Sequence, residues 1–78
     1  MNDFAEALLR DEEWLRKSST LRAIRSRIPE LDVLARGCPD RPDYARKARL
    51  LRIEEAQLAR DLVALASRIQ RRIWKGDN

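Results

Sequence analysis

The chain has 78 residues, of which 44% are hydrophobic and 38% charged, and its formal net charge is +4. This length allows one domain at most. With no histidine and one cysteine, Cys38, the composition excludes an internal disulfide and a zinc site built from cysteine and histidine. The sequence shows no Ser–His pair, Gly-rich phosphate loop or metal-ligand cluster. We therefore expect no enzymatic activity and no cofactor.

Charge is distributed unevenly along the chain. Residues 1–15 hold five acids and one base, whereas residues 16–78 hold 16 bases and eight acids. Basic residues are concentrated in 41–52 and again in 68–75. Such clusters could contact nucleic acid or an acidic membrane, or they could simply be solvated helix surface. No aromatic stacking platform or recognition motif accompanies them, so we expect nucleic acid to be an unlikely partner.

The hydropathy pattern favours a cytoplasmic protein. The apolar residues are too interrupted for a transmembrane span, which needs about 20 in succession. The chain begins Met1-Asn2-Asp3, which is unlike the basic start of a signal peptide. We expect no membrane partner.

Apolar spacing predicts two helices in the first half of the chain, at about residues 3–17 and 20–36. In the first, Phe4, Leu8 and Leu15 share one face. On one continuous helix the apolar stripes of the two segments would lie about 150° apart, which predicts a break near the polar run 18–20. Pro29 should kink the second helix or begin a separate one. The members of the second stripe are Leu21, Ile24, Ile28, Leu31 and Ala35.

A turn at residues 37–42 should precede a long third helix at about 41–74. Gly37 is placed to cap the preceding helix in a left-handed conformation, and Pro42 suits the first turn of the next. The third helix carries an apolar seam in alternating steps of four and three residues, which Glu55 alone interrupts. The seam consists of Tyr44, Ala48, Leu51, Leu58, Leu62, Leu65 and Ile69.

These elements predict an all-α fold, a single helical domain formed by an antiparallel hairpin with a short N-terminal helix. In this register Glu55 should lie close to Arg22 or Arg25. The second helix, about 25 Å long, would leave the part of the third helix around Leu62–Ile73 uncovered. Either residues 3–17 or another chain must cover it. The predicted partner-binding residues are Trp14, Leu50, Ile53, Leu62, Leu65, Ile69, Ile73 and Trp74.

The pattern resembles the small co-chaperones of type III secretion needle subunits. The residues that carry the resemblance lie in 21–75 and are Leu31–Leu34, Gly37-Cys38-Pro39, Pro42-Asp43-Tyr44, Leu50, Leu51, Glu54, Ala56, Ile69 and Arg72. The resemblance implies a helical hairpin in the bacterial cytosol. It implies that the hairpin binds a tetratricopeptide-like chaperone, and that the pair keeps a needle subunit monomeric before export.

Three other interpretations stay open. Needle and inner-rod subunits are also short helical hairpins with a proline-containing turn, although the exterior of this chain is more heavily charged. The arginine clusters allow a nucleic-acid-binding hairpin. A self-associating bundle without a client would also cover the third helix, because chains this small rarely stabilise themselves through one core.

Overall fold

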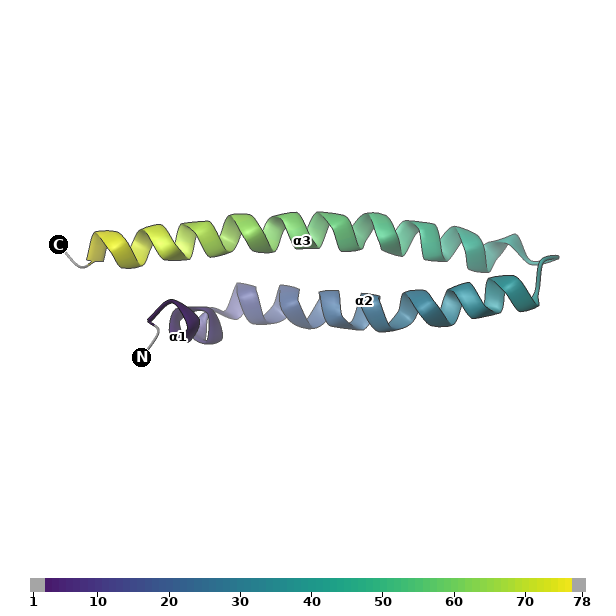
Figure 1. Ribbon diagram of the computed structural model, residues 1–78, viewed down its shortest axis with the longest axis horizontal. Coiled ribbons are helices and arrows are strands. Elements are labelled where there is room, and N and C mark those ends of the chain that lie inside the picture. The colour runs from purple at the N-terminus through teal and green to yellow at the C-terminus, as the bar shows by residue number, and fades with distance from the viewer. Residues whose placement is uncertain (1–2, 77–78) are drawn as a thin grey trace.

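The computed structural model describes residues 3–76, which form three α-helices and no strand. Helix α1 spans Asp3–Arg10, α2 spans Glu12–Gly37 and α3 spans Pro42–Gly76. Helices α2 and α3 run antiparallel side by side, and the N-terminal α1 lies at the end of the hairpin where α3 finishes (Figure 1). The prediction of an all-α helical hairpin is confirmed.

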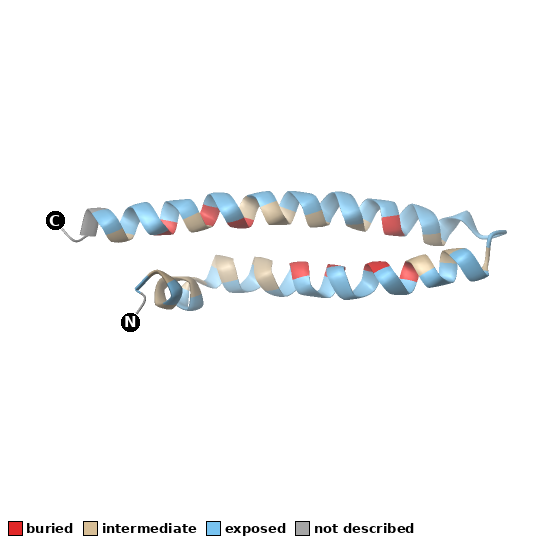
Figure 2. Ribbon diagram, in the orientation of Figure 1, coloured by how far each residue is buried: buried red, intermediate tan, exposed pale blue. Residues whose placement is uncertain are grey.

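The core is a single layer of side chains between α2 and α3. Buried positions lie on the sides of the two helices that face each other (Figure 2). They come from the apolar stripe predicted for the second helix and the seam predicted for the third. The buried side chains are Leu21, Ile24, Ile28 and Leu31 on α2 and Ala48, Leu62, Leu65 and Ile69 on α3. The other seam residues, Tyr44, Leu51 and Leu58, are half-buried.

Ion pairs beside this layer join the two helices. Arg25 Nε lies 3.3 Å from Glu55 Oε2, which confirms the predicted proximity. Arg52 pairs with Asp32 nearer the turn. Lys17 Nζ lies 3.6 Å from Asp61 Oδ2 nearer the other end. Exposed pairs contribute little stability, typically below about 1 kcal/mol, so their main structural consequence is to favour one register of the apolar seam.

The break between the first two helices is at Asp11, and the prediction of a break at residues 18–20 was wrong. The Asp11 carboxylate accepts a hydrogen bond of 2.9 Å from the backbone N–H of Trp14, which makes Asp11 the N-cap of α2. Helix α2 then continues through Ser18–Thr20. There, the Thr20 hydroxyl donates to the Arg16 carbonyl at 3.0 Å, so this polar side chain bonds within the helix.

Two predictions about α2 also need correction. Of the two alternatives for Pro29, a kink or a separate helix, the separate helix is wrong, because α2 is one helix that contains Pro29, and the Pro29 side chain is exposed. Gly37 is the last residue of α2, and no described glycine has a positive φ. The cap is instead Cys38, at φ −131°, whose N–H donates to the Leu34 carbonyl at 2.9 Å. The Arg41 N–H donates to the Cys38 carbonyl at 3.0 Å, and α3 begins at Pro42.

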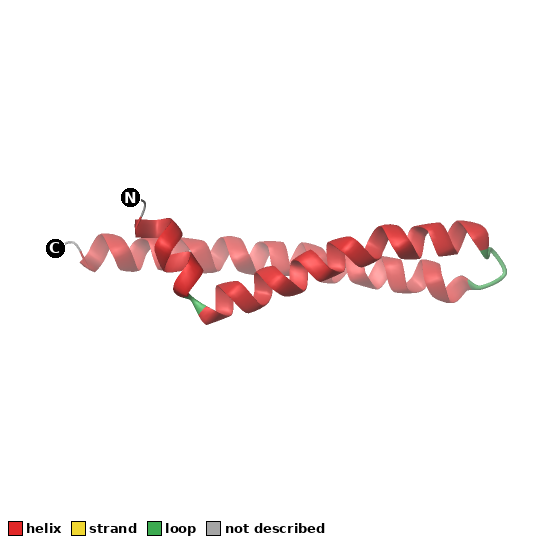
Figure 3. Ribbon diagram, turned by 90° about the horizontal axis from the view of Figure 1, so that it is seen from below, coloured by secondary structure: helices red, strands yellow, loops and turns green. Residues whose placement is uncertain are grey.

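Helix α1 is turned out of line with α2 and contacts both long helices (Figure 3). Because α1 and α2 point in different directions, their two apolar stripes can both face the hairpin although they lie at different angles around the helix. Phe4 and Leu8 become half-buried, whereas Leu15, on the far side of the break, is 45% exposed. None of the α1 side chains is fully buried, so α1 is the least firmly packed of the three helices.

Truncating a core side chain should destabilise the α2–α3 hairpin. Leu31 and Leu65 are each 3% exposed, and Leu→Ala at such sites costs about 2–5 kcal/mol. We expect Leu31→Ala and Leu65→Ala each to lower the free energy of unfolding in urea by that amount. The exposed Val63, in Val63→Ala, should change it by less than about 0.5 kcal/mol. Equal effects at the buried and exposed positions would contradict the α2–α3 core.

Removing the α2 cap should destabilise the start of that helix. We expect Asp11→Ala to cost about 1 kcal/mol, because the Trp14 N–H loses its acceptor. Asp11→Asn, which keeps a side-chain oxygen, should cost much less. Urea denaturation and the amide exchange rate of Trp14 measure the two effects. If alanine and asparagine behaved alike, the capping role of Asp11 would be wrong.

Candidate interaction surface

The structure divides the eight predicted partner-binding residues between the core and the surface. Leu62, Leu65 and Ile69 are only 8%, 3% and 3% exposed. Either residues 3–17 or another chain was expected to cover this part of α3, and in the structure the chain's own N-terminal region covers it. Helix α2 begins at Glu12 and is therefore longer than predicted, and α1 also contacts α3. These three side chains stabilise the hairpin and offer no free surface.

The other predicted residues differ in their exposure. Trp14 and Ile73 are half-buried. Leu50, Ile53 and Trp74 are exposed by 55%, 58% and 70% of their surface. Contact with another protein would remove the apolar surface of these large side chains from water, and such burial favours binding. These three remain candidate contact residues.

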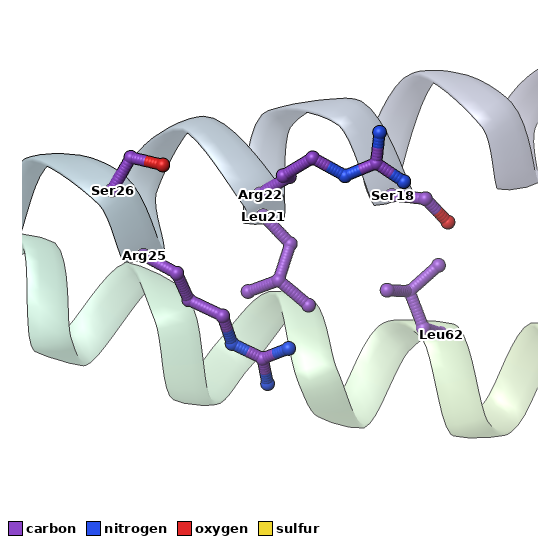
Figure 4. A pocket seen from close by; sticks show the side chains of 6 residues that line it. All are labelled: Ser18, Leu21, Arg22, Arg25, Ser26 and Leu62. Carbon is purple, nitrogen blue, oxygen red and sulfur yellow. The ribbon is translucent and has the colours of Figure 1, made fainter.

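An open groove of about 440 Å³ follows one side of the hairpin. Leu21 of α2 and Leu62 of α3 lie in the gap between the two helices, and Arg22, Arg25, Ser18 and Ser26 border it (Figure 4). Arg25 is already engaged with Glu55. The chain has no histidine to activate a serine hydroxyl. With Leu21 and Leu62 between the helices, the groove has the character of a packing surface.

A second groove, of about 430 Å³, lies where α1 meets the end of α3. Its lining combines apolar side chains with one carboxylate and two guanidinium groups. The lining residues are Ala7, Arg10, Asp11, Ile69, Arg72 and Ile73. The Asp11 carboxylate already accepts a hydrogen bond as the α2 cap. The groove is the space left between α1 and the end of α3, which pack together incompletely.

Helical projection of the sequence places Arg46 and Arg49 on the polar face of α3, but it did not identify Arg60 and Arg71 as a continuation of the same row. Arg46, Arg49, Arg60 and Arg71 are exposed and make no ion pair among residues 3–76. Linear clusters of bases drew attention to 41–52 and 68–75 but separated Arg60 from the rest. The signal that unites three of them is the 11-residue interval from Arg49 to Arg60 to Arg71, which is close to three full helical turns; Arg46 precedes Arg49 by three residues, about one turn.

Other kinds of site are not seen in the part of the chain that the structure describes. Within residues 3–76 no three Asp, Glu or Cys side chains gather as ligands of a metal ion would. No described helix has the length and apolar character needed to cross a bilayer. No protein-family model matches the chain, and neither a curated protein nor a solved structure matches it significantly. The surface itself therefore carries the functional argument.

The different exposure of the two tryptophans can be measured. Trp74 is 70% exposed, whereas Trp14 is half-buried. We expect the Trp14→Phe variant, which retains Trp74, to emit at longer wavelength and to be quenched more strongly by acrylamide than Trp74→Phe. Equal quenching of the two single-tryptophan variants would contradict the exposed position of Trp74.

Proposed function

We propose that this chain is a non-enzymatic helical hairpin whose function is to bind another protein. The observation that carries the proposal is the amount of surface that the chain leaves exposed. Its accessible area is 6366 Å², whereas a compact protein of its mass exposes about 4,900 Å². The excess of about 1,500 Å² is larger than the area of about 800 Å² that one partner contributes to a standard protein–protein interface.

The shape of the molecule explains this excess. The Cα trace measures 61 × 18 × 15 Å and has a radius of gyration of 17.2 Å. A compact domain of this length has a radius of gyration of about 11.5 Å. Two helices can cover each other on one side only, so the outer sides of both stay in water. The exposed Leu50, Ile53 and Trp74 supply apolar anchors on that surface.

The more specific role that we propose is that of a cytoplasmic co-chaperone in type III secretion. The resemblance to needle-subunit co-chaperones supports it, as do the hairpin shape and the tight turn that leads into Pro42. In this role the hairpin binds a tetratricopeptide-like chaperone. Together they hold a needle subunit monomeric before export by covering its apolar surface.

Co-expression tests this proposal. The chain is produced with a tetratricopeptide-like chaperone and a needle subunit from the same bacterium, and the mixture is analysed by size-exclusion chromatography with light scattering. We expect a stable complex that contains the chain and a soluble needle subunit. Because Ile53 and Trp74 are exposed anchors, Ile53→Asp with Trp74→Ala should weaken the complex by about tenfold or more.

Val33→Asp provides the matched control, since Val33 is 68% exposed but belongs to α2. It should leave the complex intact. A chain that stays a stable monomer beside both proteins would refute the proposal. A chain that polymerises alone would indicate a needle or inner-rod subunit instead.

A further inference from the structure

On the side of α3 that faces away from α2, the charged residues are all basic. Taking the buried Ala48, Leu62, Leu65 and Ile69 as the inner direction, a helix with about 100° per residue places four arginines within about 50° of the opposite direction. They are Arg46, Arg49, Arg60 and Arg71, and we call them the outer arginine row. Ile53 and Trp74 lie on the same outer face. All six side chains are exposed.

Carboxylates are absent from this outer face. Helix α3 contains four acids. Glu55 and Asp61 are drawn toward α2, where they pair with Arg25 and Lys17. Glu54 lines a pocket with Thr20 of α2, and Asp43 lies in the first turn of α3. Among residues 3–76, two of the four acids pair with α2 and the other two lie away from the outer direction, so the outer arginine row has no acid of α3 on its own face.

The row is also unused within the chain. The ion pairs among residues 3–76 that involve arginine use Arg25, Arg27 and Arg52, none of which belongs to the row. Unpaired guanidinium groups are suited to bidentate hydrogen bonds with carboxylates. Arg49, Arg60 and Arg71 follow one another at about 16.5 Å along the helix axis. A partner that pairs with the whole row must therefore present hydrogen-bond acceptors along the length of the helix.

We propose that the outer face of α3 docks into an acidic groove on the partner protein, with the partner's carboxylates paired to the outer arginine row. This inference rests on the proposed function and specifies the chemistry of its partner. Ile53 and Trp74 enter apolar positions between the charged contacts. Arginine and tryptophan are the residues most enriched at the energetic centres of protein interfaces, and the charge complementarity fixes the orientation of the helix in the groove.

The composition of the face favours a protein over a nucleic acid. Duplex DNA carries one charge per about 1.7 Å, whereas successive members of the row from Arg49 onward stand about 16.5 Å apart. Phosphates also offer nothing to the exposed Ile53 and Trp74, and only Trp74 could stack on a base. A protein groove can provide spaced carboxylates and apolar pockets together.

The same face disfavours a second copy of the chain. A twofold dimer through the outer face of α3 would bring one outer arginine row against another. Like charges placed opposite each other across an interface cost several kcal/mol. The outer face therefore requires a partner of opposite charge.

The test uses the tetratricopeptide-like chaperone as the probe and measures its affinity for the chain between about 50 and 500 mM salt, a range over which surface charges become screened. The variant pair Arg49→Glu and Arg60→Glu reverses two charges of the row. The control pair Arg22→Glu and Arg36→Glu makes the same charge change at exposed, unpaired arginines of α2. Circular dichroism confirms helix content in each variant. Arg49→Gln with Arg60→Gln repeats the test without adding negative charge.

We expect the outer pair to weaken binding by about tenfold or more and to flatten its salt dependence, while the control pair stays within about threefold. Equal effects of the two pairs would overturn the inference. So would row-dependent binding to duplex DNA or to phosphatidylglycerol vesicles with unchanged binding to the chaperone. If the wild-type chain binds no protein partner, the proposed function fails and the inference fails with it. If a complex forms but ignores the arginine substitutions, the inference alone fails.

Discussion

The structure depends on one layer of apolar side chains held between two antiparallel helices. Each helix presents a stripe to the other, and the ion pairs Arg25–Glu55 and Arg52–Asp32 flank that layer. Among residues 3–76 the one further helix is α1, which packs at one end of the hairpin, so most of the outer side of each long helix stays in water. The hairpin is stabilised by packing on one side of each helix only. For the same reason, much of its surface stays available to another molecule.

The α2–α3 layer could be predicted well from the sequence, because helical periodicity reports directly on which positions face a core. All buried residues of the described chain belong to the stripe from Leu21 to Leu31 or to the seam from Ala48 to Ile69, although Leu51 and Leu58 of that seam are only half-buried. Even the interruption of the seam was informative, because an acid on an apolar face needs a partner and Arg25 is that partner.

The junction near the N-terminus was harder to predict, because two local signals competed. The polar run 18–20 suggested the break, whereas the acidic run 11–13 was counted toward the negative charge of residues 1–15. In the structure the acidic run is the start of a helix, with Asp11 as the cap and two glutamates in the first turn. Negative charge there is favourable because it meets the positive end of the helix dipole. That early start gives α2 the length to cover Leu62 and Leu65, and it withdraws both from the predicted interaction surface.

The acidic residues of α3 and the outer arginine row lie on different sides of the helix. Glu55 and Asp61 pair with α2 and Asp43 lies in the first turn, whereas the outer arginine row lies on the side away from α2. If only solubility governed the outer side, both signs would serve equally well, and mixed charges would stabilise the isolated helix through pairs three and four residues apart. The outer face has no such oppositely charged pairs over about seven helical turns. A surface that carries one sign of charge with exposed Ile53 and Trp74 gains its favourable interactions only when another molecule of opposite charge is present.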